Sequence, residues 1–315
     1  MTTAPAPRGD RKARVAAILN GAIDPHVHSG PSIAARALDH LDLARQLSDA
    51  GFAAVVTKDH DYAGVATAQL INKQFPDLRT KVFSGIALNN VVGGLNPYAV
   101  EHMAAMGGKI VWMPTLSAEN HFRWQKETQR SHPASTDKIR PATVVPVLDA
   151  GKRLRDDAKE ILDVIAKNDL VLASGHLHVS ETWIVFEEAQ RRGVKRLVFT
   201  HPEDIVYASL NDVKGIAAMG AMVEHSLCMF VEGSKFKSQP SEALGHHIEA
   251  AGIDSTIFCS DLGQVGAFSP LEGFQSAVEL CMDLGYADAD IHKMVSTNTA
   301  RVLGLEDLVK ARTVA

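Results

Sequence analysis

Cysteine is scarce in this sequence, which holds Cys228, Cys259 and Cys281 among 315 residues. No two of them form a Cys-x-x-Cys pair, so the chain is neither a disulfide-stapled scaffold nor a protein with a zinc site made of thiolates alone. So few cysteines are typical of a reducing compartment, and we therefore expect a cytoplasmic protein.

Long apolar runs and a basic surplus are also missing. No stretch reaches the roughly 18 apolar residues that a membrane helix needs. The formal net charge is −5, from 32 Lys and Arg against 37 Asp and Glu. A chain without an excess of basic residues attracts polyanions poorly, so we expect neither nucleic acid nor a membrane as partner. The expected partner is a small-molecule substrate.

Short apolar runs recur along the chain and are typical of parallel strands buried on both faces. These runs are Ala22–His28, Ala53–His60, Lys81–Leu88, Lys109–Thr115, Leu170–His176, Arg196–His201, Ala221–His225 and Thr256–Asp261. Between them lie five segments with apolar residues at helical spacing, and four of these are followed by glycine, as many helices are. These segments are Leu38–Ala50, Asp156–Lys167, Glu181–Arg192, Ser209–Met219 and Glu242–Ala251.

The alternation of eight strands with helices predicts an α/β protein with a (β/α)8 TIM barrel. An open doubly wound sheet is the alternative, but no Gly-x-Gly-x-x-Gly follows the first strand. We expect one barrel domain over residues 21–305, closed by a helix over Ile291–Leu305. Residues 1–20, which begin with a Pro- and Ala-rich stretch and lack a signal-peptide pattern, are expected to be a disordered tail. Residues 306–315 are expected to be a C-terminal tail.

A long interval without strand pattern, residues 117–154, follows the fourth strand. Long loops at the mouth of a barrel are often lids or substrate loops, so we predict a lid-like insertion there. A surface excursion or a contact between two copies in a homo-oligomer are the alternatives.

Two histidines separated by one residue, His26 and His28, stand at the end of the first strand. Alternate side chains of a strand point to the same face, and the active sites of barrels lie at the carboxyl ends of the strands. Two imidazoles that converge there make half of a divalent metal site.

Other strands also end in polar side chains that can ligate a metal. A single histidine after a strand is usually a buried or capping residue, but a set that follows strand after strand favours a metal site. The predicted metal ligands are His26, His28, Lys58, His176, His201 and Asp261. The predicted neighbours or further ligands are Asp24, which would orient His26, and His60, His178 and His225. The histidines in helical stretches, expected to face solvent, are His40, His102, His246, His247 and His292.

This arrangement resembles the amidohydrolase superfamily, in which a (β/α)8 barrel carries His-x-His after strand one, His after strands five and six, and Asp after strand eight. His26, His28, His176, His201 and Asp261 match that order. The segment Asn-Thr-Ala-Arg-Val-Leu-Gly-Leu at 298–305 also resembles the family's closing helix, with Thr299 in place of proline. The chain is further similar to an uncharacterised subgroup with Lys-x-His after strand two and the Leu-Asn-Asn-Val-Val-Gly-Gly-Leu-Asn-Pro stretch at 88–97.

The chain departs from that family at the ligand that bridges two metals. Binuclear members carry a carboxylated lysine or a glutamate after strand four, where this chain has Met113-Pro114-Thr115. A carboxylated Lys58 after strand two would bridge two metals; an ammonium at Lys58 would instead pair with a nearby or substrate carboxylate. The expected cofactor is one or two divalent ions, zinc first, with manganese, iron or nickel as alternatives.

The resemblance implies a metal-dependent hydrolase that cleaves an amide, cyclic amide or lactone bond of a small molecule by a metal-activated water. Asp261 would act as general base and then acid, and His201 or His178 would stabilise the oxyanion. Asn89, Asn90 and Arg123 are predicted to bind substrate.

Three other functions remain open. A mononuclear decarboxylase or lyase would keep Lys58 as an ammonium. A phosphoesterase with three metals would use His60, His178 and His225 together as ligands. A non-catalytic barrel is the last alternative, although a structural site has no need of an open coordination position.

Overall fold

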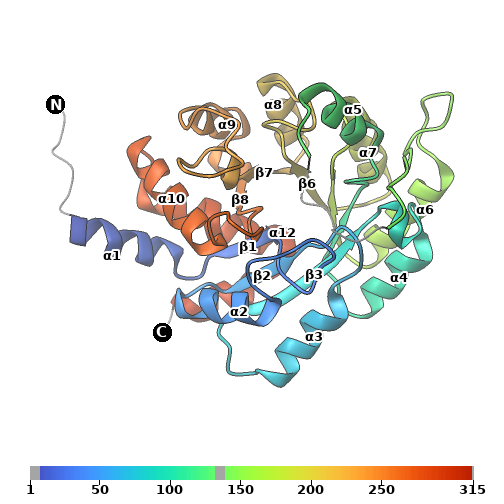
Figure 1. Cartoon of the computed structure of the whole chain (residues 1–315). Helices are drawn as coiled ribbons and strands as arrows, with labels where there is room; N and C mark the ends of the chain where they lie inside the picture. Colours follow the sequence, from blue (N-terminus) through green and yellow to red (C-terminus); the bar gives the residue numbers. More distant parts are fainter. Residues whose placement is uncertain (1–7, 132–138, 314–315) are drawn as a thin grey trace.

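A computed structural model describes residues 8–131 and 139–313. Its strands form one parallel sheet in the order β1 to β8. They are β1 (Ile23–Val27), β2 (Ala54–Thr57), β3 (Lys81–Ala87), β4 (Ile110–Trp112), β5 (Val171–Ala173), β6 (Arg196–Thr200), β7 (Met222–Ser226) and β8 (Thr256–Cys259). Every predicted strand is present, and the predicted (β/α)8 TIM barrel is confirmed (Figure 1).

Backbone hydrogen bonds just beyond the last strand join it to the first. The amide of Asp261 donates to the carbonyl of His26 at 3.1 Å, and the amide of His28 donates to the carbonyl of Leu262 at 2.8 Å. The sheet thereby closes at the end where the predicted metal ligands stand.

Helices surround the barrel on its outside (Figure 1). They are α1 (Arg8–Leu19), α2 (His40–Asp49), α3 (Val65–Gln74), α4 (Pro97–Ala105), α5 (Glu119–Thr128), α6 (Asp156–Lys167), α7 (Val179–Arg191), α8 (Leu210–Ala218), α9 (Ala243–Ala251), α10 (Pro270–Asp283), α11 (Asp288–His292), α12 (Asn298–Leu303) and α13 (Glu306–Thr313). The five predicted helical segments correspond to α2, α6, α7, α8 and α9. None of the described helices has the length and apolarity to cross a membrane.

The floor of the barrel is a packed apolar layer that joins the strand interiors to α12. Ile23, Trp112 and Ile257 from the strands belong to the same buried cluster as Leu303 of α12. The predicted closing helix over Ile291–Leu305 consists of the end of α11, a π-helical turn over Lys293–Thr297 and α12. Because this end is filled with side chains, the opposite end is the one that can admit a ligand.

The expectation of a disordered tail over residues 1–20 is wrong for the part of it that the structure describes. Residues 8–19 form α1, which lies beside α10 (Figure 1). Val15, Ile18 and Leu19 bury their side chains in the apolar cluster of α10, and Arg11 pairs with Asp283 at 2.8 Å. The three apolar residues are spaced so that they lie on one face of the helix. The Pro- and Ala-rich residues at the start of the sequence drew attention away from this helical pattern. Residues 1–7 lie outside the described residues.

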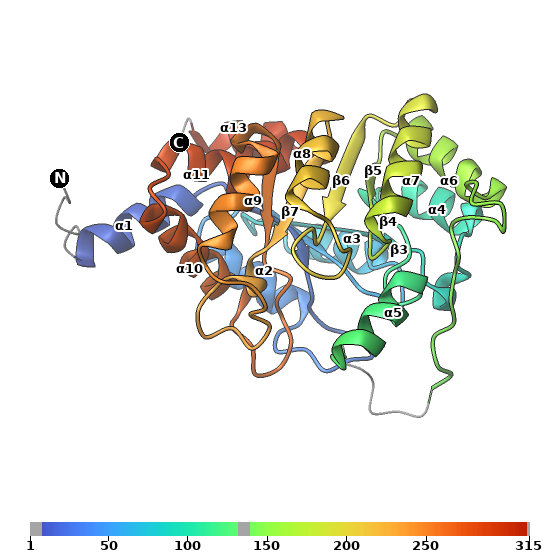
Figure 2. The same cartoon turned by 90° about the horizontal axis from the view of Figure 1, so that it is seen from above.

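The predicted C-terminal tail also contains a helix, because α13 covers Glu306–Thr313. The insertion at 117–154 begins with α5, which Figure 2 shows on the side toward which the arrow of β6 points. Trp124 of α5 donates its indole N–H to Asp204 at 3.0 Å, so this part of the insertion is packed against the loop after β6. Residues 132–138 lie outside the described residues, and the lid role stays a prediction.

Candidate metal centre

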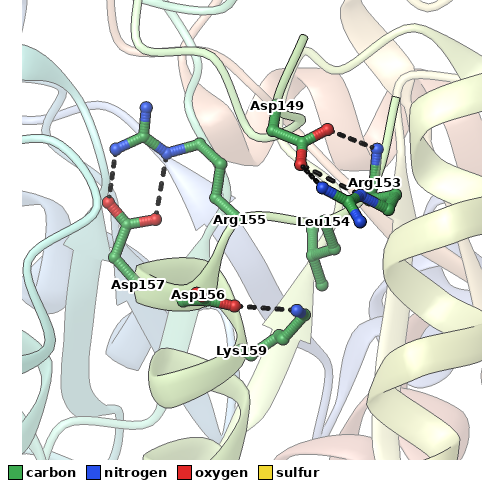
Figure 3. A pocket seen from close by; sticks show the side chains of 7 residues that line it. All are labelled: Asp149, Arg153, Leu154, Arg155, Asp156, Asp157 and Lys159. Atoms are coloured by element: carbon green, nitrogen blue, oxygen red, sulfur yellow. Dashed lines mark hydrogen bonds and ion pairs between the residues drawn. The ribbon is translucent and has the colours of Figure 1, made fainter. Parts of the chain in front are cut away.

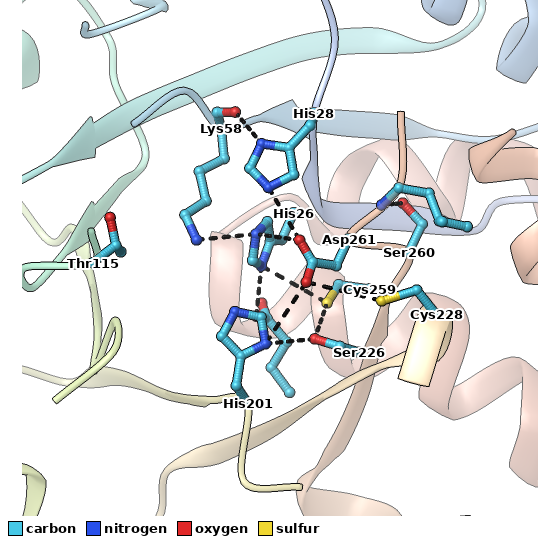
Figure 4. Close-up of polar contacts among 12 residues, drawn as sticks. His26, His28, Lys58, Thr115, His201, Ser226, Cys228, Cys259, Ser260 and Asp261 are labelled. Atoms are coloured by element: carbon cyan, nitrogen blue, oxygen red, sulfur yellow. Dashed lines mark hydrogen bonds and ion pairs between the residues drawn. The ribbon is translucent and has the colours of Figure 1, made fainter. Parts of the chain in front are cut away.

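The two histidines of β1 converge on one carboxylate. Nε2 of His26 lies 3.2 Å, and Nε2 of His28 3.0 Å, from Oδ1 of Asp261 (Figure 4). Nδ1 of His28 lies 2.9 Å from the carbonyl oxygen of Lys58. A carbonyl only accepts, so the ring proton of His28 sits on Nδ1 and the lone pair of Nε2 faces Asp261.

His26 is held from behind by a second carboxylate. Its Nδ1 lies 3.0 Å from Oε1 of Glu224 on β7, and both side chains are completely buried. A carboxylate on one ring nitrogen fixes the tautomer that presents the other nitrogen to a metal, and it makes that nitrogen more basic.

His201 and His176 complete one side of the centre. Nδ1 of His201 lies 2.7 Å from Oγ of Ser226 and 3.9 Å from Oδ2 of Asp261. The rings of His176 and His201 lie 5.2 Å apart between centroids, and Nδ1 of His176 lies 3.0 Å from Nδ1 of His121 on α5. His121 is therefore in contact with the predicted ligand set.

Left-handed backbone conformations turn these side chains toward the barrel axis. His201 has φ +57° and Asp261 has φ +52°, values that cost a non-glycine residue energy. Before His176, Gly175 has φ +61°, and a Cβ there would lie 2.2 Å from the carbonyl oxygen of Met113. Strain retained after two strands, β6 and β8, is typical of functional sites.

Lys58 points into the same cluster. Its side chain is buried, Nζ donates to Nε2 of His26 at 3.0 Å, and Nζ lies 5.6 Å from the ring centroid of Trp112 (Figure 4). No carboxylate among the described residues lies within 4 Å of Nζ. A buried ammonium with this little compensation is costly.

Burial and neighbouring charges shift the pKa values of this cluster. Burial alone would raise the pKa of Asp261, but the contacts with His26 and His28 hold it well below its ordinary value. Burial lowers the pKa of His28 to about 3 and also lowers the pKa of Lys58, whereas it raises the pKa of Asp24 to about 7. The centre thus combines an ionised carboxylate with a neutral imidazole.

The donor set fits a divalent metal ion. His26, His201 and Asp261 each place one ligand atom within 4.8 Å of the others. Imidazole nitrogen with carboxylate oxygen suits zinc and neighbouring transition metals. A cavity of about 300 Å³ opens onto this set and is lined by, among others, His28, Lys58, His60, His176, His201 and Asp261.

His60 borders this cavity. Its Nδ1 lies 2.8 Å from Oγ1 of Thr115, and its ring stacks on that of His28 at 5.1 Å. His178 lies elsewhere, because it caps the N-terminus of α7 and lines a separate surface hollow. His225 faces the outer layer, where its Nδ1 lies 2.6 Å from Oε1 of Glu203. His60, His178 and His225 therefore lie in three different places and do not form the joint ligand set expected of a three-metal phosphoesterase.

Asp24 supports the backbone and does not orient the His26 ring. Its Oδ1 accepts from the amides of His26 at 3.2 Å and Ser260 at 3.1 Å, and its Oδ2 accepts from Oγ of Ser260. The carboxylate that contacts the His26 ring is Glu224. Strand alternation could have identified Glu224 from the sequence. Neighbouring residues of β7 point to opposite faces, and Glu224 points into the barrel whereas His225 points outward.

The predicted substrate residues are divided between two places. Asn89 and Asn90 both line a neighbouring cavity of about 600 Å³. Asn89 is buried, and its side-chain amide is used by Thr115, by the amide of Ser117 and by the carbonyl of His60. Arg123 lies outside the metal cavity, with its guanidinium 4.4 Å from the ring centroid of Tyr207.

Arg36 and Arg130, in contrast, line the metal cavity. Arg130 pairs with Asp204 at 2.5 Å. Nε of Arg36 has no hydrogen-bond partner within the described ranges 8–131 and 139–313. Arg36 therefore brings to the cavity wall a cation that is influenced by Asp59, Asp261 and Asp61 but forms no ion pair within 4 Å among the described residues.

A further hollow of about 600 Å³ lies at the start of α6 (Figure 3). Its charges are already paired: Arg155 with Asp157 at 2.7 Å, Arg153 with Asp149 at 3.0 Å and Lys159 with Asp156 at 2.8 Å. Exposed, mutually paired charges give no reason to place chemistry there.

Comparison with known proteins supports the fold over the whole chain. The model of a family of unknown function, DUF6282, matches residues 21–224. No curated protein sequence matches the chain. An amidohydrolase from Pseudomonas aeruginosa has a TM-score of 0.63 at 12% identity, covering 95% of this chain and 99% of that chain.

Two other solved structures are similar. The probable dipeptidase PvdM from Pseudomonas aeruginosa has a TM-score of 0.62 at 11% identity, covering 96% of this chain and all of that chain. The organophosphorus hydrolase from Deinococcus radiodurans has a TM-score of 0.60 at 14% identity, with 92% and 94% covered. At these identities the likeness shows a shared fold.

Proposed function

This chain belongs to the DUF6282 family, whose function is unknown, and we propose that it is a metal-dependent hydrolase of the amidohydrolase superfamily. The bond we propose it cleaves is an amide, cyclic amide or lactone of a small molecule. The single observation that carries the proposal is the convergence of His26, His28 and His201 on Asp261 at the open end of the barrel. The fold shared with proteins described as an amidohydrolase and a dipeptidase supports it.

The proposed ligands are His26, His28, Lys58, His176, His201 and Asp261, with zinc as the first candidate. A divalent ion supplies a Lewis acid that polarises the scissile carbonyl and lowers the pKa of water. Asp261 borders the cavity as an ionised carboxylate and is positioned to accept the proton of the attacking water and return it to the leaving group. Nδ1 of His201 is used by Ser226, so His201 would donate to the oxygen that becomes negative through Nε2 only where that nitrogen does not ligate the ion.

We infer that Lys58 is carboxylated, and its carbamate would be able to hold two ions. The neutral amine adds to the carbon of carbon dioxide with loss of one proton, which leaves an anionic carbamate. A carbamate beside His26 would attract divalent ions, whereas an ammonium 3.0 Å from a ligating nitrogen would repel them. The lack of a carboxylate partner for Lys58 within the described ranges supports this assignment.

The cavity favours a substrate that carries a carboxylate. Arg36 stands half-buried in the wall and forms no ion pair within 4 Å among the described residues, while Arg130 is paired with Asp204 and Lys235 donates to the carbonyl of Val265 at 2.6 Å. A guanidinium pairs well with a carboxylate through parallel hydrogen bonds. Arg36 would hold the acid group while the scissile bond lies against Asp261.

Metal analysis and activity together test the proposal. Protein purified without chelator is analysed for zinc, manganese, iron and nickel, and amides, cyclic amides and lactones bearing a carboxylate are screened for hydrolysis. We expect bound metal and hydrolysis that chelation abolishes and metal restores. In Asp261→Asn we expect loss of hydrolysis and of the metal bound at the barrel centre. Protein that binds no metal even with added zinc or manganese contradicts the proposal. Release of carbon dioxide in place of hydrolysis would favour the decarboxylase alternative.

A further inference from the structure

A second group of metal-ligating side chains lies outside the barrel interior. It consists of Glu203 in the loop after β6, His225 on β7 and His247 on α9, and we call it the outer cluster. One ligand atom from each lies within 4.8 Å of the others. Nδ1 of His225 lies 2.6 Å from Oε1 of Glu203, and the rings of His225 and His247 lie 5.6 Å apart in an edge-to-face arrangement.

The outer cluster is buried and incompletely satisfied. The exposed fraction is 8% for Glu203, zero for His225 and 9% for His247. Oε2 of Glu203, Nε2 of His225 and Nδ1 of His247 have no hydrogen-bond partner among the residues that the structure describes. One such atom in a protein interior is costly, and three in one cluster need a common explanation.

Each of these three side chains retains an unused atom of the kind that binds metals. Two imidazoles and a carboxylate form the ligand set of many zinc sites, and an ion held by the ligand atoms that lie within 4.8 Å of one another would offset the cost of burying them. The surroundings are apolar, since Phe230 lies 6.0 Å from His247 and Phe258 lies 6.3 Å from His225 between ring centroids. An apolar shell strengthens the attraction between a cation and its ligands.

We propose that Glu203, His225 and His247 form a second divalent-metal site, separate from the barrel centre, with zinc as the preferred ion. The ion ties three elements together: the loop after β6, strand β7 and helix α9. Glu203 stands two residues after His201, so this site also anchors the loop that carries His201 with its left-handed backbone. The site has a structural role, and it does not depend on the proposed hydrolase activity.

Metal content in paired variants tests this site. His247→Gln and Glu203→Gln are each expected to lose about one metal equivalent per chain relative to the native protein. The matched control is His246→Gln, because His246 is the exposed neighbour on the same helix and should keep the full metal content. In Asp261→Asn, where the barrel centre is impaired, zinc should still bind with about one equivalent and raise the melting temperature.

A further variant distinguishes loss of a metal ligand from loss of the folded structure. His247→Cys supplies another zinc ligand at the same position and is expected to restore the equivalent that His247→Gln loses. Circular dichroism and gel filtration verify that each variant is folded. A crystal of the zinc-loaded protein should show anomalous scattering between His225 and His247.

Two results would overturn the proposal. One is a folded His247→Gln protein with the same metal content as His246→Gln. The other is a zinc-soaked crystal with no anomalous peak at the outer cluster. Failure of the barrel centre gives a different pattern, in which variants of His26 and Asp261 leave the metal content unchanged.

Discussion

Nδ1 of His26 lies 3.0 Å from Oε1 of Glu224, with both side chains completely buried across the barrel from β1 to β7. The pair directs Nε2 of His26 toward Asp261 and Lys58. A negative charge on the far side of a ligating imidazole raises the basicity of the nitrogen that meets the metal.

Replacing Glu224 should therefore weaken metal binding without removing a ligand. Glu224→Gln preserves size but removes the charge, and we expect metal affinity at the barrel centre to fall about 10–100-fold. Competition with a chromophoric chelator measures the change. Glu249→Gln on the exposed side of α9 is the control, and equal affinities for the two variants would contradict this role.

Lys58 determines the number of ions at the barrel centre if it is carboxylated. In Lys58→Ala we expect the barrel centre to fall from about two ions to about one or none, because the bridging carbamate is lost. Metal analysis is compared with that of His247→Gln, which separates this loss from loss at the outer cluster. A Lys58→Ala protein with unchanged metal content would make Lys58 an amine and favour the mononuclear alternatives.

Arg36 is expected to select substrates that carry a carboxylate. Arg36→Gln should raise KM for such a substrate about 10–100-fold, which corresponds to a charged hydrogen bond of about 1.5–3 kcal/mol. The matching neutral substrate should be little affected. Arg123→Gln is the control because that arginine lies outside the metal cavity. The same KM increase for acid and neutral substrates would argue against a charge interaction.

His40 makes the folded protein sensitive to mild acid. It is buried, with Nδ1 2.5 Å from Oγ of Ser29 and Nε2 3.3 Å from the Tyr62 hydroxyl. Burial lowers its pKa, an effect that the charges of Asp59 and Asp39 only partly oppose. The unfolded chain therefore binds a proton that the folded chain excludes, and the stability contributed by neutral His40 is lost as pH falls below about 6.5.

In His40→Gln the free energy of unfolding should fall less steeply between about pH 7 and pH 5 than in the native protein. Urea unfolding of metal-free protein at several pH values measures this slope. His102→Gln, at an exposed position on α4, should leave the slope unchanged. Identical slopes for all three proteins would show that His40 does not titrate differently in the folded state.

Helix α1 is expected to contribute to the stability of the barrel. Ile18→Ala removes a buried side chain from the cluster shared with α10 and should cost about 2–5 kcal/mol of unfolding free energy. Ala17→Ser, at an exposed position of the same helix, is the control. A change within about 0.5 kcal/mol for Ile18→Ala would mean that α1 is not docked in solution.

Patterns along the chain were sufficient to predict all eight strands but not all of the helices. Buried parallel strands are short apolar runs, so their positions depend on composition over a few residues. Helices such as α3 and α10 escaped prediction. Ser269 caps α10 and accepts from the amide of Glu272. The Ser269-Pro270 pair followed by Glu272 is a helix-start pattern that could have predicted α10 from the sequence.

The histidines predicted to face solvent from helices show a second limit of prediction from the sequence. His40 and His247 are buried although their helices carry an exposed face, whereas His246 next to His247 is exposed. Which neighbour turns inward depends on how a helix is rotated against the sheet, and that rotation depends on residues far away in the chain.

The sequence by itself determined the barrel and the polar residues that follow its strands, because strand and helix periodicity are local properties. The tertiary structure alone decided which of these residues meet. It turned Glu224 inward and His225 outward, and it joined His225 to Glu203 and His247 outside the barrel. The physical reason is that closure of the sheet brings distant strand ends together, while strand parity and left-handed turns set the direction of each side chain.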